Sequence, residues 1–152
     1  MCLRNAVLAL LALSCVPVAC GGGSDDGESS DAVIEGWVNT LSKGKPEAAA
    51  GYFAVPSLVA NGTPPVTLRS RADAIAFNRS LPCGARLVST REQGRFVAAT
   101  FRLTERPGGS CGSGAGQLAR TAFVIRDGKI VEWRRLPNPP GSGGGGATGP
   151  IV

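Results

Sequence analysis

FVIRDGKIVEWRRL, residues 123–136, predicts a β-hairpin near the end of the chain. Two apolar runs flank Asp127-Gly128, a pair that tolerates the positive φ of a tight two-residue turn. The runs cover residues 118–126 and 130–136, and each is long enough for a strand. The pattern therefore predicts an antiparallel pair of strands at this end of the folded region.

Two further strands are predicted upstream of the hairpin. Residues 85–92 and 95–105 flank a Gln93-Gly94 turn signal. Alternation in the second run places four apolar side chains on one face, namely Val97, Ala99, Phe101 and Leu103. The glycine-rich segment 107–116 reads as a loop between the two pairs, so four antiparallel strands are expected in all.

The region before these strands carries helical patterns. Residues 30–43 place apolar side chains at helical spacing, and these are Val33, Ile34, Trp37, Val38 and Leu41. Gly44 ends this helix, and Pro46 opens a second one over residues 46–53, because proline is tolerated in a first turn. Residues 54–69 contain three prolines and are expected to hold a loop and one short strand.

A third helix is predicted from a capping box. Ser70 and Asp73 have the spacing at which each side chain accepts a hydrogen bond from the other residue's backbone N–H. The helix is expected to run to about Arg79 and to present one small apolar side, made of Ala72, Ile75 and Ala76. Pro82 then stops it.

Helices followed by strands give an α+β fold. The Trp37 helix, the segments PEAAAGYF (46–53) and SRADAIAF (70–77), and the hairpin of residues 123–136 resemble the nuclear-transport-factor-2-like (NTF2-like) fold, also called SnoaL-like. The resemblance covers residues 31–136. It implies three N-terminal helices packed in a curved antiparallel sheet, which forms a cone with a pocket at its open end.

The resemblance also suggests which side chains could line that pocket. Five aromatic residues are the candidates: Trp37, Tyr52, Phe101, Phe123 and Trp133. For Trp37 and Trp133 the leading interpretation is a filled core, and for Tyr52 it is a packed position on the second helix with the hydroxyl at the rim; pocket lining is the alternative for all three. The sequence leaves these alternatives open.

The five cysteines of the chain divide into two groups. Cys83 follows the third helix, and Cys111 lies in the glycine-rich loop, two points that an antiparallel meander can bring to the same end of a sheet. We predict a structural disulfide between them, which requires an oxidising compartment. A metal site is not predicted, because the chain has no histidine and too few other ligands.

The first group of cysteines belongs to a predicted export signal. Residues 1–19 combine Arg4, a short apolar run and Ala19 just before Cys20. This arrangement resembles a bacterial lipoprotein signal, in which Cys20 would be the acylated first residue of the mature protein. Pro17 departs from the usual pattern, Cys15 is a weaker candidate, and cleavage without lipid attachment is the alternative.

Low-complexity segments border the predicted domain. Residues 20–30 are rich in glycine, serine and acidic side chains and are expected to form a flexible tether. Residues 137–152 are rich in glycine and proline and are expected to form a disordered tail. The tethered domain would lie on the extracytoplasmic face of the bacterial cell membrane.

The resemblance brings an enzyme hypothesis with it. NTF2-like enzymes include ketosteroid isomerases, polyketide cyclases and dehydratases, which need a carboxylate or a His–Asp pair as general base. This chain has no histidine, and no acidic residue lies between Glu47 and Asp73, where the isomerase base is expected. We therefore predict no catalytic residue and no cofactor.

The number and distribution of charged residues limit the classes of partner that we expect. The chain carries 16 Lys and Arg against 11 Asp and Glu, a net charge of +5. The arginines are spread singly and do not interleave with aromatic side chains, so nucleic acid is not an expected partner. The leading hypothesis is a non-catalytic lipoprotein domain that binds a small apolar ligand or a protein. The alternatives are an isomerase- or dehydratase-like enzyme with an unconventional base, and a structural module that forms homodimers.

Overall fold

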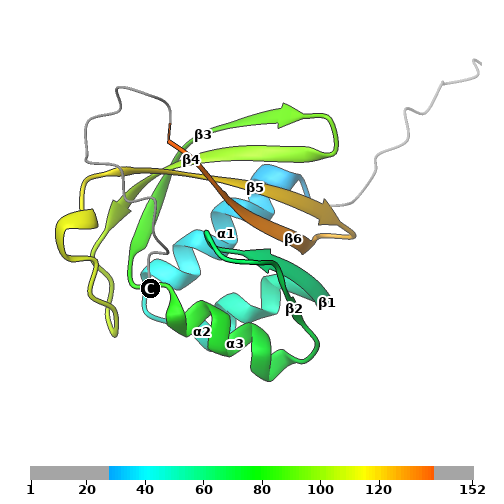
Figure 1. Cartoon of the computed structure of the whole chain (residues 1–152), viewed down its shortest axis with the longest axis horizontal. Coiled ribbons are helices and arrows are strands. Elements are labelled where there is room, and N and C mark those ends of the chain that lie inside the picture. The colour runs from blue at the N-terminus through cyan, green and yellow to red at the C-terminus, as the bar shows by residue number, and fades with distance from the viewer. Residues whose placement is uncertain (1–27, 139–152) are drawn as a thin grey trace, which may run out of the picture.

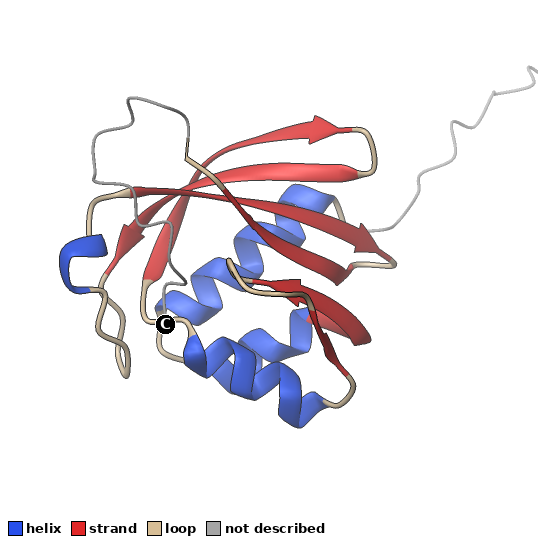
Figure 2. Cartoon of the chain, viewed as in Figure 1, coloured by secondary structure: helices blue, strands red, loops and turns tan. Residues whose placement is uncertain are grey.

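The computed structural model describes residues 28–138, which form an α+β domain (Figures 1 and 2). Three α-helices lie in the concave side of a curved sheet. The helices are α1 (Ser30–Ser42), α2 (Pro46–Ala49) and α3 (Arg71–Ser80). The strands are β1 (Phe53–Ala60), β2 (Val66–Leu68), β3 (Gly84–Gln93), β4 (Phe96–Thr104), β5 (Leu118–Arg126) and β6 (Lys129–Leu136). The predicted fold class is confirmed.

The sheet has six strands in the order β2-β1-β6-β5-β4-β3. All neighbouring strands are antiparallel except β1 and β6, which run parallel. The expectation of a wholly antiparallel sheet was therefore wrong at this one pair. Hairpins force antiparallel pairing, whereas β1 reaches β6 only through β2, α3 and the meander, so no turn fixes their relative direction. Residues 54–69 also supply more strand than predicted, since they hold most of β1 and all of β2.

The second helix is shorter than the sequence indicated. It ends at Ala49, a 3-10 turn covers Ala50–Tyr52, and Phe53 already begins β1. Phe53 is only 5% exposed and packs edge-on against Trp37 and Phe77, with ring centroids 6.2 and 5.7 Å apart. Extended backbone at Phe53 delivers this ring to the core, and aromatic packing overrides the helical tendency of the alanines.

The third helix has its capping box but buries a different face. Ser70 Oγ accepts from the N–H of Asp73, and the Asp73 carboxylate accepts from the N–H of Ser70. Ala72 and Ala76 are exposed, whereas Ala74 and Asn78 are fully buried. Of the predicted apolar side, Ile75 packs against the core, whereas Ala72 and Ala76 do not, so the prediction was wrong for the two alanines.

A buried amide explains the rotation of α3. Asn78 Oδ1 accepts a hydrogen bond of 2.9 Å from the indole N–H of Trp37, and its amide donates to the carbonyl of Ala74. Asparagine is normally a surface residue, so apolar periodicity alone does not mark it for burial. Its two hydrogen bonds satisfy the buried amide, and the one from Trp37 joins α3 to α1.

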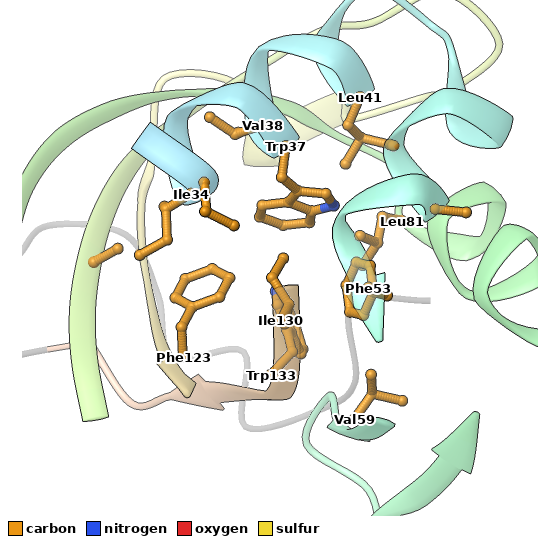
Figure 3. Packing of buried hydrophobic residues seen from close by; sticks show 14 of the residues in the cluster. Ile34, Trp37, Val38, Leu41, Phe53, Val59, Leu81, Phe123, Ile130 and Trp133 are labelled. Carbon is orange, nitrogen blue, oxygen red and sulfur yellow. The ribbon is translucent and has the colours of Figure 1, made fainter. Parts of the chain in front are cut away.

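Trp37 lies at the centre of the aromatic core (Figure 3). Its ring meets four others edge-on at centroid distances of 5.6–6.5 Å, and these belong to Phe53, Phe101, Phe123 and Trp133. Edge-to-face packing of this kind stabilises the core beyond the burial of apolar area. Large rings therefore fill much of the space between α1 and the sheet.

Several sequence predictions fall outside the residues that the structure describes. These are the signal peptide of residues 1–19, the attachment residue Cys20, and nearly all of the tether and of the C-terminal tail. Within residues 28–138, no helix has the length and apolar character needed to cross a membrane.

Candidate functional site

A cavity remains on the concave side of the sheet, between α1 and strands β4 to β6. Its volume is about 80 Å³. Most of its lining is apolar, and the larger contributors are Trp37, Leu41, Leu81, Phe101, Leu103 and Trp133. The polar part of the lining comes from four residues, Asn61, Arg120, Thr121 and Arg135. The cavity thus combines an apolar body with a polar side.

The structure places the five candidate aromatic residues differently. Trp37, Phe101 and Trp133 contribute to the cavity wall. Phe123 does not; its side chain is fully buried in the core beside α1 (Figure 3). Tyr52 lies against Gly36 of α1, so closely that a Cβ at Gly36 would come within 2.7 Å of the phenolic oxygen.

Strand β6 positions the polar side of the cavity. Side chains at alternate positions of a strand share a face, so Trp133 and Arg135 both project toward the cavity. Their cross-strand partners on β5 are Phe123 and Thr121, respectively. Arg134, between them, points to the convex face.

The guanidinium of Arg135 is unusual because part of it is buried without a partner. Its Nη1 atom is inaccessible to solvent and has no acceptor among the described residues. Burial lowers the pKa of Arg135 below its usual value, because desolvation disfavours the charged form. Arginine still stays protonated, so a partly buried cation has one nitrogen without an acceptor among the described residues.

Trp133 repeats this pattern. Its Nε1–H is buried and finds no acceptor within the described part of the chain, although Trp133 is only 5% exposed. The indole of Trp37, a few ångströms away, donates to Asn78 instead. Buried donors are normally paired, so two unpaired donors on one cavity wall call for an explanation. The remaining unpaired buried atom, Ser57 Oγ, lies on β1 outside the cavity lining.

Acidic side chains are absent from the cavity lining formed by residues 28–138. Glu47 pairs with Arg79 on the surface, and this hydrogen bond holds the pKa of Glu47 below its usual value. Glu105 accepts from the backbone N–H groups of Cys111 and Gly112. Each of these carboxylates therefore has a structural role away from the cavity.

The one deeply buried carboxylate faces the other way. Glu132 is 5% exposed and pairs with Arg95 at 2.9 Å and with Arg134. The guanidinium of Arg95 also stacks on the ring of Phe96, 4.3 Å from its centroid. This cluster covers Glu132 on the convex face, and the carboxylate is satisfied there.

The predicted disulfide is present and forms part of the cavity wall. Cys83 and Cys111 are joined with their Cα atoms 4.5 Å apart, and Cys83 contributes to the lining. The bond ties the glycine-rich loop after β4 to the segment that enters β3.

A buried arginine that the sequence did not single out supports the same wall. Arg106 is 6% exposed and donates hydrogen bonds to the carbonyls of Leu81 and Arg79. These carbonyls lie at the C-terminal end of α3, where a cation is favourable. Arg106 thereby fixes the segment that carries Leu81 into the cavity, and nothing in the sequence pattern marked it.

A second hollow lies between the β1–β2 hairpin and α3. It is larger, about 530 Å³, and its lining is more polar. Its carboxylate, Asp73, is already used as the cap of α3. Hydrogen bonds from the backbone N–H of Arg69 and from Ser70 hold the pKa of Asp73 below its usual value. We therefore take the smaller, more apolar cavity, which has unpaired buried donors in its wall, as the candidate site.

Metal binding finds no support in the described residues, where no three His, Cys, Asp or Glu side chains come together.

Comparisons with known proteins show the fold. No protein-family model and no curated protein matches the sequence. An NTF2-like protein of unknown function from Cytophaga hutchinsonii superposes with a TM-score of 0.55 at 10% identity, over 73% of this chain and 91% of that one. A ketosteroid isomerase-like protein from Kribbella flavida gives 0.52 at 20% identity, over 76% and 86%. A cystatin-fold protein from Novosphingobium aromaticivorans gives 0.53 at 11% identity, over 72% and 99%.

Proposed function

We propose that this domain is a non-catalytic binding module that holds a small, largely apolar ligand in the concave cavity. The observation that supports this function is a mainly apolar cavity whose described lining includes no carboxylate. NTF2-like isomerase chemistry needs a positioned base, and a cavity lined by apolar side chains and arginines offers none.

The size of the cavity limits the ligand. Pockets that bury drug-sized molecules measure about 300–1,000 Å³, whereas this cavity measures about 80 Å³. The cavity itself therefore suits a small molecule, and a steroid would extend well beyond it.

Exposed apolar residues give less support to an interaction module. The three large exposed side chains are Val55, Val66 and Val88. Val55 and Val66 lie on β1 and β2, whereas Val88 lies on β3, at the opposite edge of the sheet. They do not form one apolar patch, which is what a docking surface needs.

The proposed location is the extracytoplasmic face of a bacterial membrane, with Cys20 as the lipid anchor. Two sequence features support it: the export signal that ends at Cys20, and a cysteine pair suited to an oxidising compartment. Expression in a bacterial host with radiolabelled palmitate tests the proposed lipid attachment and membrane location. We expect label in the membrane fraction and none in a Cys20→Ala variant; an unlabelled wild-type protein in the medium would overturn it.

Intrinsic fluorescence tests the binding function directly. Trp37 and Trp133 are the only tryptophans of the chain, and both line the cavity. We expect 1-pentanol to change their emission saturably. An Ala119→Phe variant, which fills the cavity from β5, should lose this response. Thr100→Phe adds the same ring to the opposite face of β4 and should keep it. A wild-type protein that responds to no small apolar probe would contradict the proposed function.

A further inference from the structure

We propose that the cavity recognises a small monocarboxylate with a short apolar chain, and that Arg135 and Trp133 receive its carboxylate. This inference rests on the proposed function, because it concerns the same cavity. It adds the chemical class of the ligand and the residues that select it.

The first argument is the position of the two donors. Arg135 and Trp133 are separated by one residue on β6, so their side chains lie on the same face of the sheet. Both contribute to the cavity lining, and each has a buried nitrogen without an acceptor in the described chain. A carboxylate has two oxygens with about four lone-pair sites, enough to accept from both side chains.

The second argument is charge. The described lining has two arginines and no acid, so the field inside the cavity favours an anion. Arg120 has a carbonyl acceptor, that of Pro137 at 3.5 Å, whereas the buried Nη1 of Arg135 has none among the described residues. Leaving a buried donor of a charged group unpaired is unfavourable, and an anionic ligand would supply the missing acceptor. The lowered pKa of Arg135 is consistent with this uncompensated burial.

The third argument comes from the other arginines. Those with buried or half-buried guanidinium groups elsewhere have acceptors: Arg106 has the Leu81 carbonyl, and Arg134 has Glu132. Exposed arginines need none, because water solvates them. Arg135 differs from both groups, since its Nη1 is neither exposed nor paired.

Cavity size and polarity distinguish a carboxylate from a phosphate. Tight phosphate sites gather several donors around a dianion, whereas this cavity offers one guanidinium and one indole N–H beside an apolar wall. The volume of about 80 Å³ suits a small ligand. Pentanoate is such a ligand, and its chain would contact Trp37, Phe101 and Leu103.

Binding of pentanoate to the exported full-length protein tests the proposal, with pentanamide and 1-pentanol as neutral probes of similar shape. Tryptophan emission and calorimetry report the affinities. We expect pentanoate to bind at least tenfold more tightly than pentanamide, because charge-assisted hydrogen bonds are about twice as strong as neutral ones. Inorganic phosphate should not compete.

Two neighbouring variants make the test specific. Arg135→Met should abolish the preference for pentanoate while 1-pentanol still binds, and Arg135→Lys should restore part of it. Arg134→Met, on the opposite face, should keep the full preference. Equal binding of pentanoate and pentanamide would overturn the carboxylate inference and leave the proposed function standing. Absence of binding by all three probes would overturn both.

Discussion

Glu132 and Arg135 lie three residues apart on β6, and the strand turns them to opposite faces of one sheet. On the convex face, Glu132 is buried but fully engaged by Arg95 and Arg134. On the concave face, Arg135 has a buried nitrogen with no acceptor among the described residues, and so does the adjacent Trp133. Buried polar groups that are paired hold a fold together, whereas unpaired ones beside a cavity indicate that something else completes them.

The two tryptophans show the same contrast inside the core. Trp37 donates its indole N–H to Asn78, and the ring of Trp133 packs against it with a centroid distance of 6.5 Å. The donor of Trp133 remains unpaired. The N–H of Trp37 therefore stabilises the fold, whereas the N–H of Trp133, like Nη1 of Arg135, is available to a ligand in the proposed site.

The largest effect is expected from the disulfide that forms part of the cavity wall. Replacing Cys83 and Cys111 together by serine should lower the free energy of unfolding by roughly 3–4 kcal/mol, because the bond closes a loop of about 29 residues. Urea denaturation followed by circular dichroism measures this change. Ligand binding should weaken as well, since Cys83 lines the cavity. Unchanged stability would show that the loop is held by Glu105 and Arg106 alone.

The next largest effect should come from the convex face. An Arg95→Met, Arg134→Met double variant leaves the carboxylate of Glu132 buried without a cation. Breaking a buried ion pair costs about 3–5 kcal/mol, and we expect about 2–3 kcal/mol here because both arginine side chains are partly exposed. Glu132→Gln, the matched control, should cost less, because it leaves two arginines that water can solvate. Equal losses would mean that Glu132 is solvated in the native protein.

A smaller effect separates the two indoles. Asn78→Leu leaves the N–H of Trp37 buried and unpaired, so we expect a loss of about 1–3 kcal/mol in the free energy of unfolding. The counterpart is Trp133→Phe, which removes a donor that already lacks an acceptor. Each variant is compared with wild type by urea denaturation. The loss in the free energy of unfolding for Trp133→Phe is first corrected for the smaller ring. If the remaining loss exceeds that of Asn78→Leu, then the N–H of Trp133, and not that of Trp37, is the paired donor.

The smallest effect concerns the cap of α3, away from both faces. Ser70→Ala should cost about 1 kcal/mol, because it removes the acceptor for the N–H of Asp73. The pKa of Asp73 is lower in the folded protein, so its stabilisation is present above the unfolded pKa and is lost as the pH falls through the folded value. Asp73→Asn should therefore destabilise the protein at pH 7 and converge with wild type in acid. A difference that persists in strong acid would contradict this role of the carboxylate.

Much of the fold follows from local patterns in the sequence. The Asp127-Gly128 turn, the alternation along β4 and the capping box of α3 each act within a few residues, so they are readable without knowledge of the whole. The parallel pairing of β1 with β6 is not local, since no turn connects these strands. The helical pattern of residues 46–53 likewise ended early because the ring of Phe53 packs on distant aromatic side chains.

The candidate site was harder to predict than the fold. Aromatic residues were visible candidates, and three of the five line the cavity. The unpaired donors of Trp133 and Arg135 could not be predicted, because a sequence does not show whether a side chain has a hydrogen-bond partner. Arg134 and Arg135 are adjacent and chemically identical; only the register of β6 against β5 decides which one meets Glu132 and which one meets the cavity.

The most direct test is the difference in unfolding free energy between Arg135→Met and Arg134→Met, each compared with wild type in urea without ligand. The structure predicts opposite behaviour from these neighbours. Arg134→Met should destabilise the protein because Glu132 loses a partner, whereas Arg135→Met should be neutral or stabilising by up to about 1 kcal/mol because it removes a partly buried cation with an unpaired nitrogen. Similar destabilisation by both variants would show that Arg135 already has a partner within the chain. Arg135 would then not be available to bind the carboxylate of a ligand.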